Sequence, residues 1–341
     1  MRDASALSAL GEFGFISRIA AAAPSGAGVV TGIGDDAAVT ALTPGMQLLT
    51  STDMLLEDVH FRRSWHDPLL LGRKSLAVNL SDIAAMGGIP RWVTLSLAVP
   101  RDLPLEFLDR FTCGFLAMAA EHGVSLIGGD TCSSQGGLAI SVTIMGEQLP
   151  ERILRRSGAR PGHEIWVSGT LGDSALGLAL LERRLSPDAE PPDEDRYAAL
   201  YSHLLDPVPR LRVGAALAES GLVSAMIDIS DGLLADFGHI AELSGVGGEV
   251  RLDGLPLSPP FRAERAARGE ALLELALCGG EDYELCFTAP REHREKIAGI
   301  MKMSGIEGTP VGIVTDLPGV LVTGASGAVW NPGPQGFNHF A

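Results

Sequence analysis

The sequence predicts a two-domain protein of mixed α/β (α+β) class. Its 341 residues exceed the ~100–200 residues of an ordinary single domain. Short apolar runs alternate with longer amphipathic segments along the chain, which is the pattern of an α/β protein. Apolar periodicity lapses between residues 150 and 162, in a stretch rich in Arg, Pro and Gly. We therefore expect one domain over residues 1–150 and a second over residues 151–341.

Helices are expected where apolar residues recur every three or four positions, or where a proline begins such a segment. They cover residues 5–22, 67–86, 104–122, 175–182, 196–205, 208–220, 231–243, 263–277 and 290–303. Strands are expected in the shorter apolar runs between them. They cover residues 46–52, 91–99, 124–127, 138–146, 164–168, 224–228, 249–252, 309–314 and 320–323. The acidic, Pro-rich stretch 186–195 is expected to be a surface loop.

Composition excludes several classes of protein. Apolar residues make up 46% and charged residues 20%, and no uncharged apolar run approaches the roughly 20 residues of a membrane span. The first residues resemble no secretory signal, so a cytoplasmic location is expected. A net charge of −16 argues against nucleic-acid binding, which needs a basic face. The four cysteines show no C-x-x-C spacing and are expected to be reduced thiols; they are Cys113, Cys132, Cys278 and Cys286.

Aspartates beside glycine or hydroxyl residues recur at the edges of apolar runs. They are Asp35, Asp36, Asp53, Asp82, Asp130 and Asp228. Clustered carboxylates repel one another unless cations join them, so we interpret these segments as parts of one polynuclear metal site. Its ligands are oxygens, with hydroxyls from Ser51 and Thr52 and no His or Cys, which favours Mg²⁺. Because Mg²⁺ usually bridges carboxylates to phosphates, the expected ligand is ATP.

Each of these segments also has a structural interpretation. Lys74 and Asp82 would share one face of a helix, either as a phosphate and metal site or as an ion-paired surface. Gly128 and Gly129 would allow a ligand to approach Asp130 closely in the loop after a strand, or would form only a tight turn. Asp231 could be the N-cap of the helix that follows it.

The common catalytic motifs are absent from the sequence. The chain has no G-x-x-x-x-G-K-[ST] loop, no protein-kinase motifs, no G-x-S-x-G elbow and no H-E-x-x-H helix. The turn at residues 32–37 superficially matches a dinucleotide fingerprint, but two acids stand where pyrophosphate would lie. Phosphoryl transfer, in which positioning and metal electrostatics supply the catalysis, fits the residues best.

Ten segments, taken in order, resemble the thiamine-monophosphate kinase family, within the group that includes aminoimidazole ribonucleotide synthetase. The segments are GEFGFI, GIGDDAA, STDMLLEDVHF, KSLAVNLSDIAAMGGIP, LIGGDT, RSGARPGH, SGTLGDSALGL, IDISDGLLADFGHIA, GGEDYELCF and GFNHF. The resemblance implies an N-terminal domain that forms a β-barrel-like interface in a homodimer, followed by an α/β domain. It implies ATP-dependent phosphorylation of thiamine monophosphate to thiamine diphosphate, with several Mg²⁺ ions.

The resemblance also assigns roles to single residues. The implied metal ligands are Asp36, Ser51, Thr52, Asp53, Asp82, Asp130, Asp228 and Asp231, to which we add Asp35 because it adjoins Asp36. The implied ATP contacts are Gly129, Asp130, Arg156 and Ser230. Within these sets, Asp53, Asp130 and Arg156 are expected to act in catalysis. His60 and Glu281 match positions that hold the thiamine portion.

The sequence departs from the family near its end, and two other functions stay open. The family often has an aromatic residue before the terminal glycine–aromatic pair, whereas this chain has Pro334; either Phe337 or Trp330 replaces that stacking contact, or it is absent. One alternative function is a related ATP-dependent synthetase that activates an amide oxygen or a selenide. The other is a non-enzymatic ATP-binding maturation scaffold, which would not need His60 and Glu281.

Overall fold

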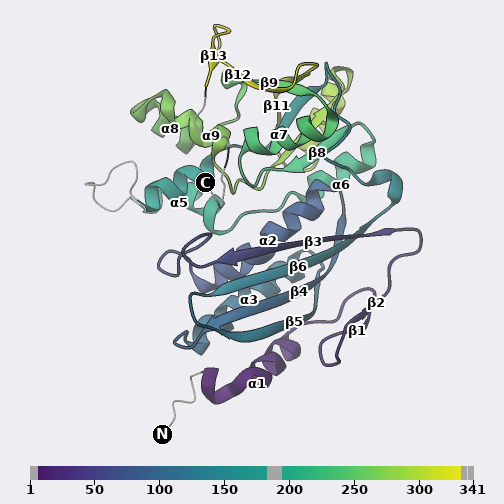
Figure 1. Cartoon of the computed structure of the whole chain (residues 1–341), viewed down its shortest axis with the longest axis vertical. Helices are drawn as coiled ribbons and strands as arrows, with labels where there is room; N and C mark the ends of the chain where they lie inside the picture. Colours follow the sequence, from purple (N-terminus) through teal and green to yellow (C-terminus); the bar gives the residue numbers. More distant parts are fainter. Residues whose placement is uncertain (1–6, 183–193, 332–335, 337–341) are drawn as a thin grey trace. The chain divides into compact units, whose positions relative to one another are not determined.

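The computed structural model describes residues 7–182, 194–331 and 336, which fall into two compact units (Figure 1). Unit 1 comprises Met1–Ile83 and Gly88–Pro150, and unit 2 comprises Ala84–Gly87 and Glu151–Ala341. Within the described ranges, no helix has both the length and the apolar character needed to cross a membrane. The cysteines in these ranges form no disulfide.

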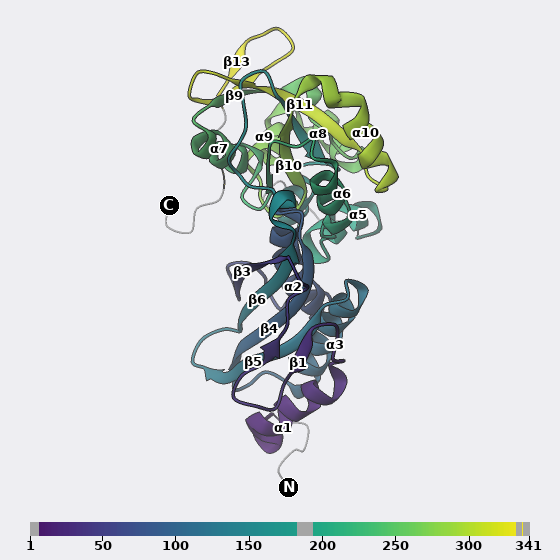
Figure 2. The same cartoon turned by 90° about the vertical axis from the view of Figure 1, so that its right-hand side faces the viewer.

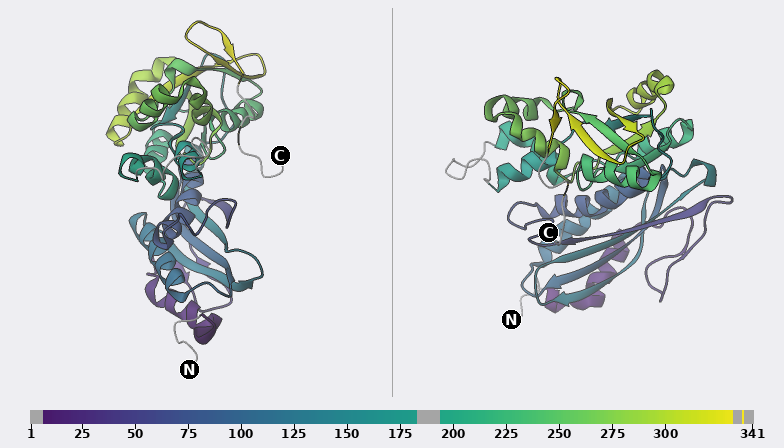
Figure 3. Two further views of the ribbon diagram at one scale, coloured as in Figure 1. Left: turned by 90° about the vertical axis from the view of Figure 1, so that its left-hand side faces the viewer. Right: turned by 45° about the horizontal axis from the view of Figure 1, so that its top comes forward.

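Unit 1 is built on a four-stranded sheet with the strand order β3-β6-β4-β5. The strands are β3 (Gln47–Leu56), β4 (Ile89–Pro100), β5 (Ser125–Ser134) and β6 (Ala139–Gln148). β4 and β5 are parallel, and the other two pairs are antiparallel. Helices α2 (Pro68–Ala85) and α3 (Leu105–Glu121) lie on one face of this sheet (Figures 2 and 3). The kinked helix α1 (Leu7–Ala22) and the hairpin of β1 (Val29–Thr31) and β2 (Val39–Thr40) complete the unit.

Alternation of side chains along the strands separates a buried face of this sheet from an open one. Val142 on β6 and Leu95 on β4 belong to the buried face, beneath the helices. The two helices approach each other closely because a glycine stands at each contact: a Cβ at Gly72 would lie 2.0 Å from the Phe111 carbonyl oxygen, and one at Gly114 would lie 1.9 Å from the Leu69 carbonyl oxygen. The two helices therefore form a tightly packed layer over the sheet.

Unit 2 contains a seven-stranded sheet with the order β13-β12-β9-β11-β7-β10-β8. Its strands are β7 (Glu164–Ser168), β8 (Ala225–Asp228), β9 (Gly247–Arg251), β10 (Leu285–Ala289), β11 (Gly308–Thr315), β12 (Gly319–Thr323) and β13 (Val329–Trp330). All neighbours are antiparallel except β12 and β9. Its helices are α4 (Asp173–Leu181), α5 (Glu194–Leu205), α6 (Leu211–Ser220), α7 (Leu233–Ser244), α8 (Pro259–Arg268), α9 (Leu273–Cys278) and α10 (Arg294–Met303). In Figure 2, α7 and α10 flank the sheet on opposite sides.

Most predicted elements are present, and the following details were wrong. Strand β3 continues to Leu56, so Asp53 lies inside the strand rather than at its end. Strand β5 likewise continues through residues 128–130 to Ser134, so Asp130 is not in a loop. The helix predicted over residues 263–277 is divided at Gly269, whose φ of 98° is incompatible with a helix. Helix α7 begins after Gly232 rather than at Asp231. Residues 194–195 of the predicted acidic loop belong to α5, and residues 186–193 of it lie outside the described residues.

Candidate active site

Three predicted metal ligands of unit 1 lie where β3 faces α2. The Ser51 hydroxyl donates a hydrogen bond to the Asp82 Oδ2 at 2.5 Å. Asp53 is two residues along the strand from Ser51 and therefore on the same face of the sheet. Burial raises the pKa of the Asp53 carboxyl to about 6, and the Asp82 carboxylate is the second cause of this increase. The strand and the helix thus bring two carboxylates and a hydroxyl together in a partly buried place.

This group is chemically suited to a hard divalent cation. All of its donors are oxygens, which Mg²⁺ prefers, and Mg²⁺ commonly binds through one or two carboxylates together with substrate phosphates. The pKa of Asp53 is raised first by burial and second by repulsion from the Asp82 carboxylate. A cation between Asp53 and Asp82 would remove that repulsion.

Thr52 points away from this group. Its hydroxyl donates a hydrogen bond to the Val142 carbonyl oxygen at 3.0 Å and accepts one from the Thr143 hydroxyl at 3.0 Å. Because adjacent residues of a strand face opposite sides, the Thr52 side chain lies on the open face while Ser51 and Asp53 lie on the covered one. The predicted role of Thr52 as a metal ligand remains a prediction, and on this strand only its backbone could reach the side of Asp53.

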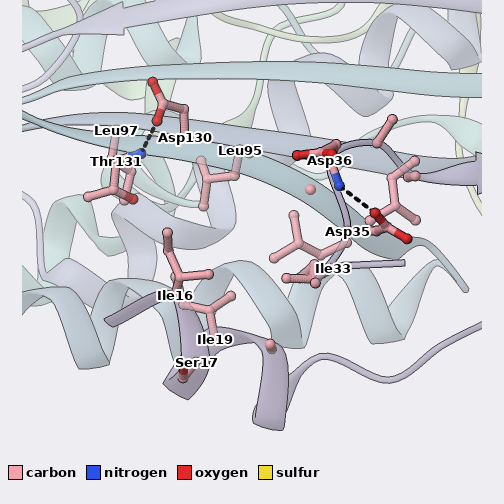
Figure 4. Close-up of a pocket in the computed structure, with 18 residues that line it drawn as sticks. Ile16, Ser17, Ile19, Ile33, Asp35, Asp36, Leu95, Leu97, Asp130 and Thr131 are labelled. Carbon is pink, nitrogen blue, oxygen red and sulfur yellow. Dashed lines mark hydrogen bonds between the residues drawn. The ribbon is translucent and has the colours of Figure 1, made fainter. Parts of the chain in front are cut away.

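A pocket of about 590 Å³ lies in unit 1 between α1, the loop at residues 33–38 and strands β4 and β5. Figure 4 shows the loop acids Asp35 and Asp36 on one side, Asp130 on β5, and the apolar side chains of Ile16 and Ile19 on α1. The Asp36 N–H donates to the Asp35 Oδ1 at 2.9 Å, so the Asp35 carboxylate helps to hold its own turn. The pocket therefore has apolar walls and an acidic rim.

The glycine before Asp130 is required by packing within the sheet. A Cβ at Gly129 would lie 1.8 Å from the Leu95 carbonyl oxygen on β4, a distance at which no side chain can be accommodated. The exposed Asp130 carboxylate accepts a hydrogen bond from the Thr131 N–H at 2.9 Å. Gly129 therefore lets β5 pass close to β4 while both Gly129 and Asp130 line the pocket.

Lys74 on α2 is fully buried, which rules out a solvated, ion-paired surface at this position. It lies near the buried ring of His66. Burial, and secondly the charge of Lys74, lower the pKa of His66 to about 3. His66 is therefore neutral at physiological pH.

In unit 2, a short turn after β8 carries three of the predicted residues. Asp228 ends the strand and is buried, and Ser230 and Asp231 follow it. Asp231 is not the N-cap of α7: Gly232 holds that position, with a φ of 117° and no capping side chain. The turn is held instead by Asp236, whose Oδ2 accepts hydrogen bonds from the N–H groups of Ser230, Asp231 and Gly232, each at 3.0 Å.

Glu281 lies beside this turn in a strained backbone. Its N–H donates to the Ser230 carbonyl oxygen at 2.8 Å, and its φ of 66° is in the left-handed region that non-glycine residues rarely adopt. The other two acids of this segment have structural partners. Asp282 is buried and accepts a hydrogen bond from the Gly172 N–H at 2.8 Å, and Glu284, 0% exposed, forms a two-pronged ion pair with Arg210. Asp282 and Glu284 therefore have structural roles in unit 2.

Arg156 and His60, the predicted contacts to ATP and to the thiamine portion, lie in different units. Arg156 is exposed, in a segment that runs beside β8, since the Met226 N–H donates to the Arg155 carbonyl oxygen at 2.9 Å. His60 follows β3, and its Nδ1 accepts the Leu56 N–H at 3.0 Å, which leaves the proton of the neutral ring on Nε2.

The predicted contacts near the end of the chain are less fully described. Pro334 and Phe337 lie outside the described residues. Trp330 is half-buried and packs against the core of unit 2.

The predicted residues therefore form one set in each unit. Unit 1 carries Asp35, Asp36, Ser51, Thr52, Asp53, His60, Asp82, Gly129 and Asp130, and unit 2 carries Arg156, Asp228, Ser230, Asp231 and Glu281. Among the described residues, no three His, Cys, Asp or Glu side chains gather closely enough to hold a metal ion by themselves. The convergence of all the acids on one site stays a prediction.

Sequence reasoning missed Asp236. An acid that lies four residues after an Asp-Gly turn, within the first turn of a helix, is a signal that could have identified it.

Comparison with known proteins is consistent with this arrangement. The N-terminal domain of AIR synthase related proteins matches residues 34–148, and their C-terminal domain matches residues 160–324. Over 338 residues, the chain is 40% identical to the thiamine-monophosphate kinase of Salmonella typhimurium, covering 98% of this chain and 99% of the relative. The chain belongs to the thiamine-monophosphate kinase family.

Solved structures extend the likeness to three dimensions. A crystal structure of thiamine-monophosphate kinase from Stenotrophomonas maltophilia K279a is 40% identical, with a TM-score of 0.80 over 90% of this chain and 95% of the other. The structure of AaThiL complexed with AMPPCP and TMP is 35% identical, with a TM-score of 0.75 over 98% of both chains. The predicted two-domain fold of this family is confirmed.

Proposed function

We propose that this protein transfers the γ-phosphoryl group of ATP to thiamine monophosphate and so produces thiamine diphosphate. The observation that carries the proposal is the family membership along nearly the whole chain, together with a related structure that holds an ATP analogue and TMP. The acidic rim of the pocket in unit 1 and the strained Glu281 in unit 2 agree with it. In its reaction class the protein is a phosphotransferase with a phosphate group as acceptor.

Mg²⁺ would be held first by Asp53 and Asp82, with Ser51 in the surrounding shell. When bound, Mg²⁺ neutralises charge on the phosphates of the nucleotide and the acceptor. Asp35, Asp36 and Asp130 in unit 1 and Asp228 and Asp231 in unit 2 are the further proposed ligands, and Thr52 would contribute through its backbone. Gly129, Asp130, Arg156 and Ser230 are the proposed ATP contacts. His60 and Glu281 are the proposed contacts to the thiamine portion.

The acceptor needs no general base from the protein. Its phosphate has a second pKa of about 6, so at neutral pH it is mostly a dianion that can attack directly. The obstacle is repulsion between two sets of phosphates, which Arg156 would reduce by charge-assisted hydrogen bonds. We therefore propose direct in-line transfer without a phosphoenzyme.

We further propose that two copies of the chain pair through the open face of the four-stranded sheet. Side chains at even-numbered positions of β3 face away from the helices, and among them Leu48, Met54 and Leu56 are exposed apolar residues. Covering them would remove apolar surface from water. The family resemblance favours a second copy as the partner, with the two sheets forming a barrel-like interface.

The decisive experiment is to incubate the purified protein with MgATP and thiamine monophosphate and to measure thiamine diphosphate by chromatography. We expect a stoichiometric product that requires both substrates and is lost when Mg²⁺ is chelated. Absence of product, together with turnover of an aminoimidazole ribonucleotide precursor, would refute the proposal. Rapid quench with γ-labelled ATP tests the in-line step, because a labelled protein intermediate would contradict it.

A further inference from the structure

A single buried carboxylate accepts hydrogen bonds from the whole turn at residues 230–232. Asp236 is 2% exposed, and one of its oxygens, Oδ2, accepts the N–H groups of Ser230, Asp231 and Gly232 at 3.0 Å each. The Asp236 N–H in turn donates to the Gly232 carbonyl oxygen at 3.0 Å. Four hydrogen bonds therefore connect this residue to the turn, and its carboxylate is committed to the backbone.

This arrangement limits what the turn before α7 can bind. Free N–H groups at the start of a helix usually attract anions such as phosphate. Here the N–H groups of residues 230–232 are turned toward Asp236, so they are satisfied within the protein. What the turn offers to a ligand is the side chains of Ser230 and Asp231, beside the buried Asp228. The groups of this turn that remain for a ligand are therefore side-chain oxygen atoms, which suit a cation better than an anion.

The same turn also supports the segment that contains Glu281. The Ser230 carbonyl oxygen accepts the Glu281 N–H at 2.8 Å, and the Ile229 carbonyl oxygen accepts the Tyr283 N–H at 2.8 Å. Contact is close enough that a Cβ at Gly280 would lie 2.4 Å from the Ser230 carbonyl oxygen. A shift of the turn would therefore move Glu281 as well.

We propose that Asp236 is a positioning residue that sets the geometry of the nucleotide and metal side chains Ser230 and Asp231 and, through the Ser230 carbonyl, of the acceptor contact Glu281. This inference rests on the proposed function, because that function gives these residues their roles. Asp236 itself touches no substrate. Its effect is transmitted by the backbone of the turn.

The test compares Asp236→Ala, Asp236→Asn and Ile240→Ala by calorimetric titration with MgATP in the absence of acceptor. Asp236→Ala removes the acceptor of three N–H groups, and we expect MgATP to bind about 10- to 100-fold more weakly, the usual effect of removing a group that orients metal ligands. Asp236→Asn keeps an oxygen in the same place and is expected to restore most of the affinity. In kinase assays, Asp236→Ala should also raise the KM for thiamine monophosphate.

Ile240→Ala is the matched control. Ile240 is fully buried on the same helix, and its apolar side chain cannot accept hydrogen bonds from the turn. It should lower the melting temperature while leaving MgATP affinity unchanged. The inference is overturned if Asp236→Ala binds MgATP like Ile240→Ala, or if Asp236→Asn is as defective as Asp236→Ala. A wild-type protein that binds MgATP but yields no thiamine diphosphate would refute the proposed function, and the binding comparison would still decide the role of Asp236.

Discussion

Replacing Asp82 by Asn is expected to stabilise the metal-free protein near neutral pH. Burial and the Asp82 carboxylate raise the pKa of Asp53 from 3.8 to about 6, and one pKa unit corresponds to about 1.4 kcal/mol, so the whole shift is about 3 kcal/mol. Burial is the larger cause, so Asp82 accounts for less than about 1.5 kcal/mol. An Asn at this position could still accept the hydrogen bond from Ser51.

The sign of the effect follows from proton binding. Because the folded-state pKa of Asp53 is raised, folded protein binds the proton more tightly than unfolded protein does. The stability that the protonated Asp53 carboxyl contributes is fully present below about pH 4 and is lost as the pH rises through about 6. In EDTA at pH 7.5, Asp82→Asn should therefore exceed the wild type in free energy of unfolding by up to about 1.5 kcal/mol, and the difference should disappear near pH 4.

Urea denaturation followed by tryptophan fluorescence measures these free energies. Saturating Mg²⁺ should make the wild type the more stable of the two proteins. A ligand at 100 times its Kd stabilises the wild type by about 2.7 kcal/mol, and it should stabilise Asp82→Asn less, because that variant lacks one of the proposed metal ligands. Asp102→Asn, at an exposed acid of the same unit, is the control. It should match the wild type in free energy of unfolding, both in EDTA and in saturating Mg²⁺. The reasoning is refuted if metal-free Asp82→Asn is no more stable than the wild type at pH 7.5.

Three further predictions concern other residues. Asp130→Asn should remove most kinase activity without lowering the melting temperature of the metal-free protein, because Asp130 is exposed; a large loss of melting temperature would contradict this. Gly129→Ala should disrupt the pairing of β4 and β5, because its Cβ would lie 1.8 Å from the Leu95 carbonyl oxygen, and hydrogen exchange should show faster exchange in both strands, unlike in a Gly136→Ala control. Arg210→Ala should cost about 3–5 kcal/mol in urea denaturation, because it leaves the buried charge of Glu284 without its partner.

Much of the fold could be predicted because the signals are local. The segment Pro68–Ala85 is recognisable as a helix from its starting proline and its apolar periodicity, and it forms α2. Strand ends were harder to predict. Residues 128–130 contain two glycines, which read as a turn, yet they lie inside β5 because β4 passes close enough to need glycine there.

The sequence by itself determined the family, the order of the elements and the set of oxygen-bearing residues available for phosphate and metal chemistry. Only the tertiary structure decided which of these residues face one another. Ser51 meets Asp82 across 31 positions of the chain, and Thr52 turns to the opposite face. Glu284 is paired with Arg210, 74 positions away. The physical reason is that burial and pairing depend on contacts between distant segments, whereas composition and periodicity report only on neighbours along the chain.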